Sequence, residues 1–84
     1  MKKRRRKKVE LVLSNDDYNS FENVIVSLRN YLPKCSVIKA EQIAQIVHNN
    51  GQCTIYSGFS PDVFIIQSQL VKQGLIVRAK SIGK

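Results

Sequence analysis

The chain has 84 residues, of which 43% are hydrophobic and 24% charged, the composition of one small folded domain. Its 14 lysine and arginine residues, against 6 acidic residues, give a formal net charge of +8. The apolar runs are too short for a transmembrane helix, and a domain of this size has little room for an enclosed active site, so composition argues against a membrane span and a large enzyme cavity.

The positive charge is concentrated at the N-terminus. Every residue from Lys2 to Lys8 is basic, whereas the rest of the chain is nearly neutral. We therefore interpret residues 1–8 as a disordered basic tail and residues 9–84 as one domain. Such a run is normally solvated, although its cations could also displace counterions from a nucleic acid. No apolar stretch follows it, so we do not expect a secretory signal.

The two cysteines, Cys35 and Cys53, lack the spacing of a disulfide framework or a zinc site. Together with His48 they would supply three possible metal ligands, but their separation along the chain does not favour one. We expect both to be buried as small hydrophobic residues in a reduced, cytoplasmic protein. No metal ion and no cofactor is predicted.

The first predicted element is a strand at Val9–Leu13, where apolar and other residues alternate. The polar residues 15–17 then favour a turn. From Ser20 a helix is predicted, because the apolar residues recur at the spacing of one helical face: Phe21, Val24, Ile25, Leu28 and Leu32. Pro33 helps to end this helix.

The second half predicts two further helices and two strands. Residues 39–49 repeat the helical pattern, and Gly51 marks the end of that helix. A strand follows around residues 53–56, ending before Ser57 and Gly58. Ser60, Pro61 and Asp62 favour the start of a helix over residues 61–73. Gly74 ends it, and residues 75–77, with Ala79 and Ile82, offer a third strand.

The resulting order of elements is β-α-α-β-α-β. Three short strands need helices packed against a face of the sheet to be stable. We therefore predict a two-layer α+β domain with a small three-stranded sheet. The sequence contains no internal repeat and no interdomain linker.

The most informative polar cluster is the run Asn15, Asp16 and Asp17, with His48 as the other candidate for a site. No catalytic triad pattern, phosphate-binding glycine loop or zinc-protease motif is present. Neighbouring side chains in a turn rarely converge on one bond, so we predict that the protein is not an enzyme. On the residues alone, this run is best interpreted as a turn that bonds its own backbone.

Two blocks resemble the ClpS family, adaptors that bring N-degron substrates to an AAA+ Clp unfoldase. The first is Leu13-Ser14-Asn15-Asp16-Asp17-Tyr18-Asn19-Ser20-Phe21, followed by Val24, Ile25 and Leu28. The second is Ala40-Glu41-Gln42 with residues 46–53, Ile-Val-His-Asn-Asn-Gly-Gln-Cys. The resemblance covers about residues 9–81, including Gly74-Leu75. It implies a ClpS-like fold, in which three helices pack on a three-stranded antiparallel sheet.

The resemblance also implies a peptide-binding site. Asn15, Asp16 and His48 would surround the α-ammonium group of a substrate, and Asp17 would support the turn. An apolar pocket would hold the first side chain, with walls from Phe21, Val24, Ala44, Val47 and Leu75. Phe21 and Ala44 stand where methionine is common in the family. Residues at such helical spacing also form ordinary core, so the walls have this second interpretation. Asp62 matches the unfoldase-facing surface.

The function implied is that of a non-enzymatic adaptor, which binds proteins beginning with Leu, Phe, Tyr or Trp and delivers them to a ClpA-like or ClpC-like unfoldase. We expect a cytoplasmic monomer that binds no membrane. An alternative is a small nucleic-acid-associated or ribosome-associated protein that acts through its basic tail. The body lacks a basic stripe or a row of aromatic residues, which disfavours nucleic acid. A paralogue with the fold but no substrate is a third possibility.

Overall fold

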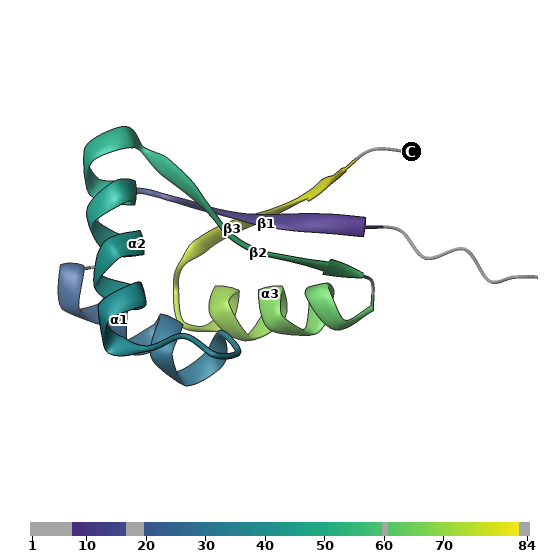
Figure 1. The fold of residues 1–84 in the computed structure, drawn as a ribbon, viewed down its shortest axis with the longest axis horizontal. Helices are drawn as coiled ribbons and strands as arrows, with labels where there is room; N and C mark the ends of the chain where they lie inside the picture. The colour runs from purple at the N-terminus through teal and green to yellow at the C-terminus, as the bar shows by residue number, and fades with distance from the viewer. Residues whose placement is uncertain (1–7, 17–19, 60, 83–84) are drawn as a thin grey trace, which may run out of the picture.

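The computed structural model describes residues 8–16, 20–59 and 61–82 (Figure 1). The elements follow one another as β1 (Lys8–Ser14), α1 (Phe21–Tyr31), α2 (Val37–Asn50), β2 (Gln52–Phe59), α3 (Asp62–Lys72) and β3 (Ile76–Ser81). The predicted order β-α-α-β-α-β is confirmed. No helix within these residues is long and apolar enough to cross a membrane.

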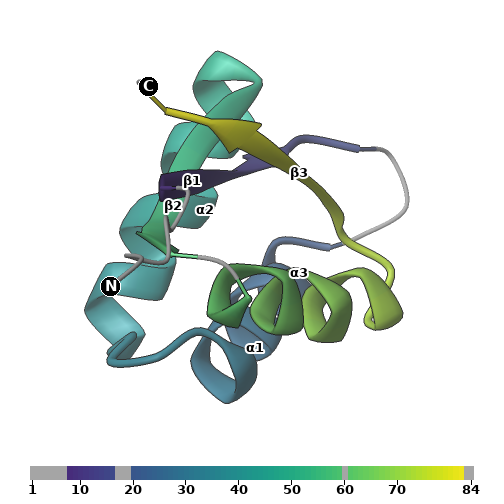
Figure 2. The same ribbon diagram turned by 90° about the vertical axis from the view of Figure 1, so that its right-hand side faces the viewer.

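The three strands form one antiparallel sheet with β1 in the centre, in the order β2-β1-β3. Val9, Leu11 and Leu13 are buried, whereas the residues between them are half-buried, so β1 has one face toward the core. Figure 2 shows α1 and α3 together below the strands, with α2 passing behind β1 and β2. The prediction of a two-layer α+β domain is therefore confirmed.

The hydrophobic core lies between the sheet and the helices. α3 contacts all three strands, and α1 contacts both other helices. The largest fully buried side chains come from the central strand and from two helices: Leu11, Leu13, Leu28, Val63 and Leu70. Burial of such side chains, about 1.5 to 3 kcal/mol each, is the main force that holds the layers together. The Gln67 side chain adds a hydrogen bond to the Val77 carbonyl oxygen at 2.9 Å.

α2 begins at Val37, two residues before the predicted start. The Oγ of Ser36 accepts a hydrogen bond from the Lys39 backbone N–H at 3.1 Å, and this cap supports the additional helical residues. At the other end Gly51 adopts a left-handed conformation, with φ of 95°, as predicted for the residue that ends the helix.

β2 is longer than predicted, because Ser57 and Gly58 are part of the strand and do not end it. Both pair with β1, and Ile55 is the extra residue of a bulge within β2. The packing at Gly58 is close: a Cβ atom at this position would lie 3.1 Å from Cε2 of Tyr56, so a larger residue would require the tyrosine ring to shift. Pairing with a central strand outweighs the turn preference of a serine–glycine sequence.

The remaining boundaries differ from the prediction by one or two residues. β1 begins at Lys8, so one residue of the predicted tail belongs to the sheet, and residues 1–7 lie outside the described residues. α3 runs over Asp62–Lys72, with Pro61 directly before it, and Ser60, the predicted cap, lies outside the described residues as well. β3 begins at Ile76, one residue after Leu75.

Candidate functional site

The site is built where the end of β1 meets the end of α2. The backbone N–H of Asn15 donates a hydrogen bond to the carbonyl oxygen of Gly51 at 2.9 Å. Asn15 is exposed and Asp16 half-buried, directly after the central strand. This contact between residues far apart in the sequence brings the polar segment after β1 to the last turn of α2.

The last turns of α2 supply three side chains to the site. Ala44 and His48 are one helical turn apart and therefore neighbours on the helix surface. Ala44 and Val47 are each only 4% exposed, whereas His48 is exposed. Because Ala44 has a small side chain, space remains between the imidazole and the helix that faces it.

α1 supplies the opposite wall. The Oγ of Ser20 accepts a hydrogen bond from the Asn23 backbone N–H at 3.0 Å, and this cap sets where the helix begins. Phe21 is the first helical residue and is 42% exposed, and Val24 is half-buried one turn later. An aromatic ring at the rim of a hollow is half-exposed in this way when nothing covers it.

These segments enclose a single cavity of about 490 Å³. Its lining consists of Asn15, Asp16, Phe21, Val24, Ala44, Val47 and His48. One side offers amide, carboxylate and imidazole groups that accept hydrogen bonds, and the other side is apolar. Among residues 8–16, 20–59 and 61–82, no lysine or arginine lines the cavity. The arrangement is suited to a ligand with a cationic hydrogen-bond donor next to an apolar group.

Leu75 does not line this cavity, although it was predicted as one of its walls. It is 3% exposed and lines an adjoining narrow hollow of about 10 Å³, together with Leu13 and Ser14 and with four residues that also line the larger cavity: Asn15, Asp16, Val24 and Val47. A space of this size is at the lower limit for a single water molecule, about 10 to 15 Å³. The floor beneath the larger cavity is therefore closely packed.

Of the two remaining predicted residues, one lies outside the described part of the chain and the other lies outside the cavity. Asp17 lies outside the described residues. Asp62 is the first residue of α3, three positions after Phe59, which pairs with Lys8 at the start of β1. Since Asn15 follows the other end of β1, Asp62 lies at the opposite end of the sheet from the cavity.

The cysteines also lie outside the cavity, and both are free thiols. The prediction that both are buried is wrong, because each is only half-buried at the edge of the core. Burial raises the pKa of the Cys35 thiol, while the positive charges of Lys39 and Arg29 act in the opposite direction. Burial likewise raises the pKa of Cys53, against the effect of Lys39. Within the described part of the chain, no group of three His, Cys, Asp or Glu side chains could hold a metal ion.

One element of the site has no signal in the sequence. Gly51 is predictable as the end of a helix, but its carbonyl oxygen also holds the segment after β1 through Asn15. That contact is a backbone hydrogen bond, and any residue pair can form one. No pattern of side chains could have indicated it.

Comparisons with known proteins agree with this fold. A family model described as "ATP-dependent Clp protease adaptor protein ClpS" matches residues 4–75. Curated ClpS adapter proteins from Thermosynechococcus vestitus and Synechocystis are 29% and 27% identical over 66 residues, which is 79% of this chain and 70% and 67% of theirs.

A solved structure of Agrobacterium tumefaciens ClpS2 bound to L-phenylalaninamide has a TM-score of 0.86 and 19% identity. The match covers 93% of this chain and 100% of that chain, so the two share the fold. The family match extends over most of the sequence, including both helices and the strand ends that build the cavity. This chain therefore belongs to the ClpS family of ATP-dependent Clp protease adaptors, which are adaptor proteins and not enzymes.

Proposed function

We propose that this protein binds the first residue of polypeptides that begin with Leu, Phe, Tyr or Trp and delivers them, in the cytoplasm, to a ClpA-like or ClpC-like AAA+ unfoldase. The observation that carries the proposal is the cavity itself: hydrogen-bond acceptors and an apolar wall converge in it from β1, α1 and α2. Membership of the ClpS family and the phenylalaninamide ligand of the similar structure lend support.

In this proposal the α-ammonium group binds at the polar side of the cavity. The Asp16 carboxylate and the Asn15 side-chain oxygen accept its protons, and the imidazole of His48 accepts through its unprotonated nitrogen. Charge-assisted hydrogen bonds of this kind contribute about 1.5 to 3 kcal/mol each. An acetylated N-terminus has neither the charge nor the same donors, so it would lose these contacts.

The first side chain enters the apolar side, between Phe21 and Val24 of α1 and Ala44 and Val47 of α2. Burial of a large apolar side chain contributes about 1.5 to 3 kcal/mol. After subtraction of the entropic cost of association, at least about 4 kcal/mol, these contributions reach at most about −8 kcal/mol, so micromolar affinity is the upper limit. Weak binding suits an adaptor that must release its cargo.

The unfoldase contact is assigned to the exposed start of α3, with Asp62 at its first position. This surface lies at the opposite end of the sheet from the cavity, so both ligands can bind at once. Asp17 is assigned to support of the turn, and Leu75 to the packed floor.

The experiment is fluorescence anisotropy with labelled peptides that differ only at residue one. We expect micromolar binding of peptides that begin with Leu, Phe, Tyr or Trp, and at least about tenfold weaker binding of Ser, Val and N-acetyl-Leu peptides. Asp16→Asn and His48→Ala should abolish the preference. Equal, weak binding of all peptides would refute the proposal.

Asp62→Asn is the matched control, because it removes the same carboxylate charge at the far end of the sheet. It should retain peptide affinity and lose affinity for the unfoldase. If the basic residues at the N-terminus were responsible for binding, the affinity would instead fall steeply as the salt concentration is raised and would not depend on the first residue of the peptide.

A further inference from the structure

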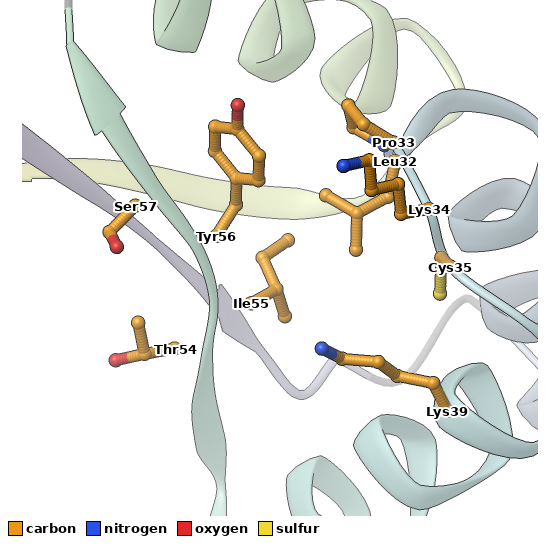
Figure 3. Close-up of a pocket in the computed structure, with 9 residues that line it drawn as sticks. All are labelled: Leu32, Pro33, Lys34, Cys35, Lys39, Thr54, Ile55, Tyr56 and Ser57. Atoms are coloured by element: carbon orange, nitrogen blue, oxygen red, sulfur yellow. The ribbon is translucent and has the colours of Figure 1, made fainter.

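A second cavity, of about 400 Å³, lies between the α1–α2 connection, the start of α2, and β2 (Figure 3). Its lining consists of Leu32, Pro33, Lys34, Cys35, Lys39, Thr54, Ile55, Tyr56 and Ser57. None of these residues lines the cavity of the proposed peptide site. The two hollows can therefore be tested independently.

Two ammonium groups are directed into this cavity. Figure 3 shows the side chains of Lys34 and Lys39 extending from the connection and from α2 toward β2, one toward the ring of Tyr56 and the other toward Ile55. Among the described residues, no aspartate or glutamate lines this cavity. Both lysines are exposed to solvent, and two like charges beside one hollow without a carboxylate favour an anion between them.

The backbone adds to this unbalanced charge. Lys39 is in the first turn of α2, which has no acidic residue, so a cation faces the positive end of the helix dipole. The same ammonium group lowers the pKa of both cysteine thiols against the larger effect of burial, and Arg29 does so for Cys35. The field at this end of α2 is therefore positive from several sources.

Lys34 also holds an unfavourable backbone conformation. Its φ is 56°, and in the described part of the chain it is the one residue other than glycine with a positive φ. Glycine or asparagine would adopt this conformation at lower cost. A lysine that occupies such a position and extends into a cavity is more easily explained by a role of its side chain than by the stability of the turn.

The rest of the lining can contact an organic group. The ring of Tyr56 faces the cavity beside Lys34 in Figure 3, with Ile55, Leu32 and Pro33 around it. The hollow is open to solvent, and its volume of about 400 Å³ falls in the range of small-molecule sites, roughly 300 to 1,000 Å³. We propose that this cavity binds a phosphomonoester of nucleotide size, its phosphate held between Lys34 and Lys39 and its organic part against Tyr56.

The test is an NMR titration of the full chain, labelled with ¹⁵N, in which adenosine 5′-monophosphate is the probe and inorganic phosphate and adenosine are separate arms. We expect the nucleotide to give saturable shifts of the amides that line this cavity, and inorganic phosphate to shift the same amides more weakly. Adenosine should shift none of them. The amides of Asn15, Asp16 and His48 should not respond.

Variants in the full chain separate a built site from general attraction to a basic protein. Lys34→Gly and Lys39→Gln should each weaken nucleotide binding about tenfold. Lys72→Gln and Lys80→Gln are the matched controls, since they remove the same charge from exposed positions outside the cavity lining. Lys34→Gly should also maintain or raise the melting temperature, because glycine accepts the positive φ.

Three results would overturn the proposal. The first is that nucleotide shifts are confined to residues 1–8. The second is that the control variants weaken binding as much as the cavity variants do. The third is that no saturable shift occurs at millimolar nucleotide. Each can be read without the peptide assay, so its result is separable from that of the proposed adaptor function.

Discussion

Gly51 has two structural roles, as the end of a helix and as a hydrogen-bond acceptor. Its left-handed conformation, with φ of 95°, ends α2, and its carbonyl oxygen accepts the hydrogen bond from Asn15. A Cβ atom added here would meet nothing within 4 Å, so a larger residue would be limited by backbone conformation alone and not by a clash. A substitution at this position therefore measures the cost of the backbone conformation without a contribution from a packing clash.

We predict that Gly51→Ala lowers the free energy of unfolding by about 1 to 2 kcal/mol, the cost of the left-handed region for a residue with a Cβ. Urea denaturation measures this change. Gly51→Asn is the matched control, since asparagine tolerates the conformation better and should cost less. An alanine variant as stable as the parent would mean that the helix end relaxes to another conformation.

Two of the helices, α1 and α2, owe their starting points to serine caps. Ser20 caps α1 and Ser36 caps α2, each through a hydrogen bond from the backbone N–H three residues later. The cap on α2 explains why the helix includes Val37 and Ile38, which the apolar spacing alone did not indicate. The start of α2 in turn places Lys39 at the second cavity.

Ser36→Ala should lower the free energy of unfolding by about 1 kcal/mol, within a range of about 0.5 to 2, because the Lys39 N–H loses its acceptor. Ser36→Asp should retain the cap and most of the stability. Thermal or urea unfolding of the three proteins checks the order. If the aspartate variant were as unstable as the alanine variant, the hydroxyl would act through something other than capping.

The stability of the whole molecule should depend on pH through its two thiols. Burial raises the pKa of Cys35 and Cys53 in the folded state. The unfolded chain then loses these protons first as the pH rises, and ionised thiols favour unfolding. This contribution to stability is fully present below the ordinary thiol pKa, about 8.5, and is lost as the pH rises through the folded-state value.

We therefore predict that the urea concentration at the unfolding midpoint decreases as the pH is raised from neutral to about 10. The Cys35→Ala/Cys53→Ala variant should show a smaller decrease. The variant must be compared with itself at neutral pH, because loss of two half-buried side chains also changes stability. An identical decrease in both proteins would assign the alkaline effect to other groups.

Much of the fold was predictable because it depends on local pattern. The alternation of Val9, Leu11 and Leu13 indicated β1, and the helical spacing with Gly51 indicated α2 and its end. The course of β2 through Ser57 and Gly58 was not, because turn preference is a local property whereas pairing with β1 is not.

The sequence by itself determined the order of the elements, and its resemblance to the family also named the residues that line the cavity at the end of β1. Only the tertiary structure decided that Asn15 meets the end of α2, that Leu75 lies beneath the cavity, and that Lys34 and Lys39 face one hollow. The physical reason is range: periodicity and capping act within a few residues, whereas a cavity is made by segments that sheet pairing and core packing bring together.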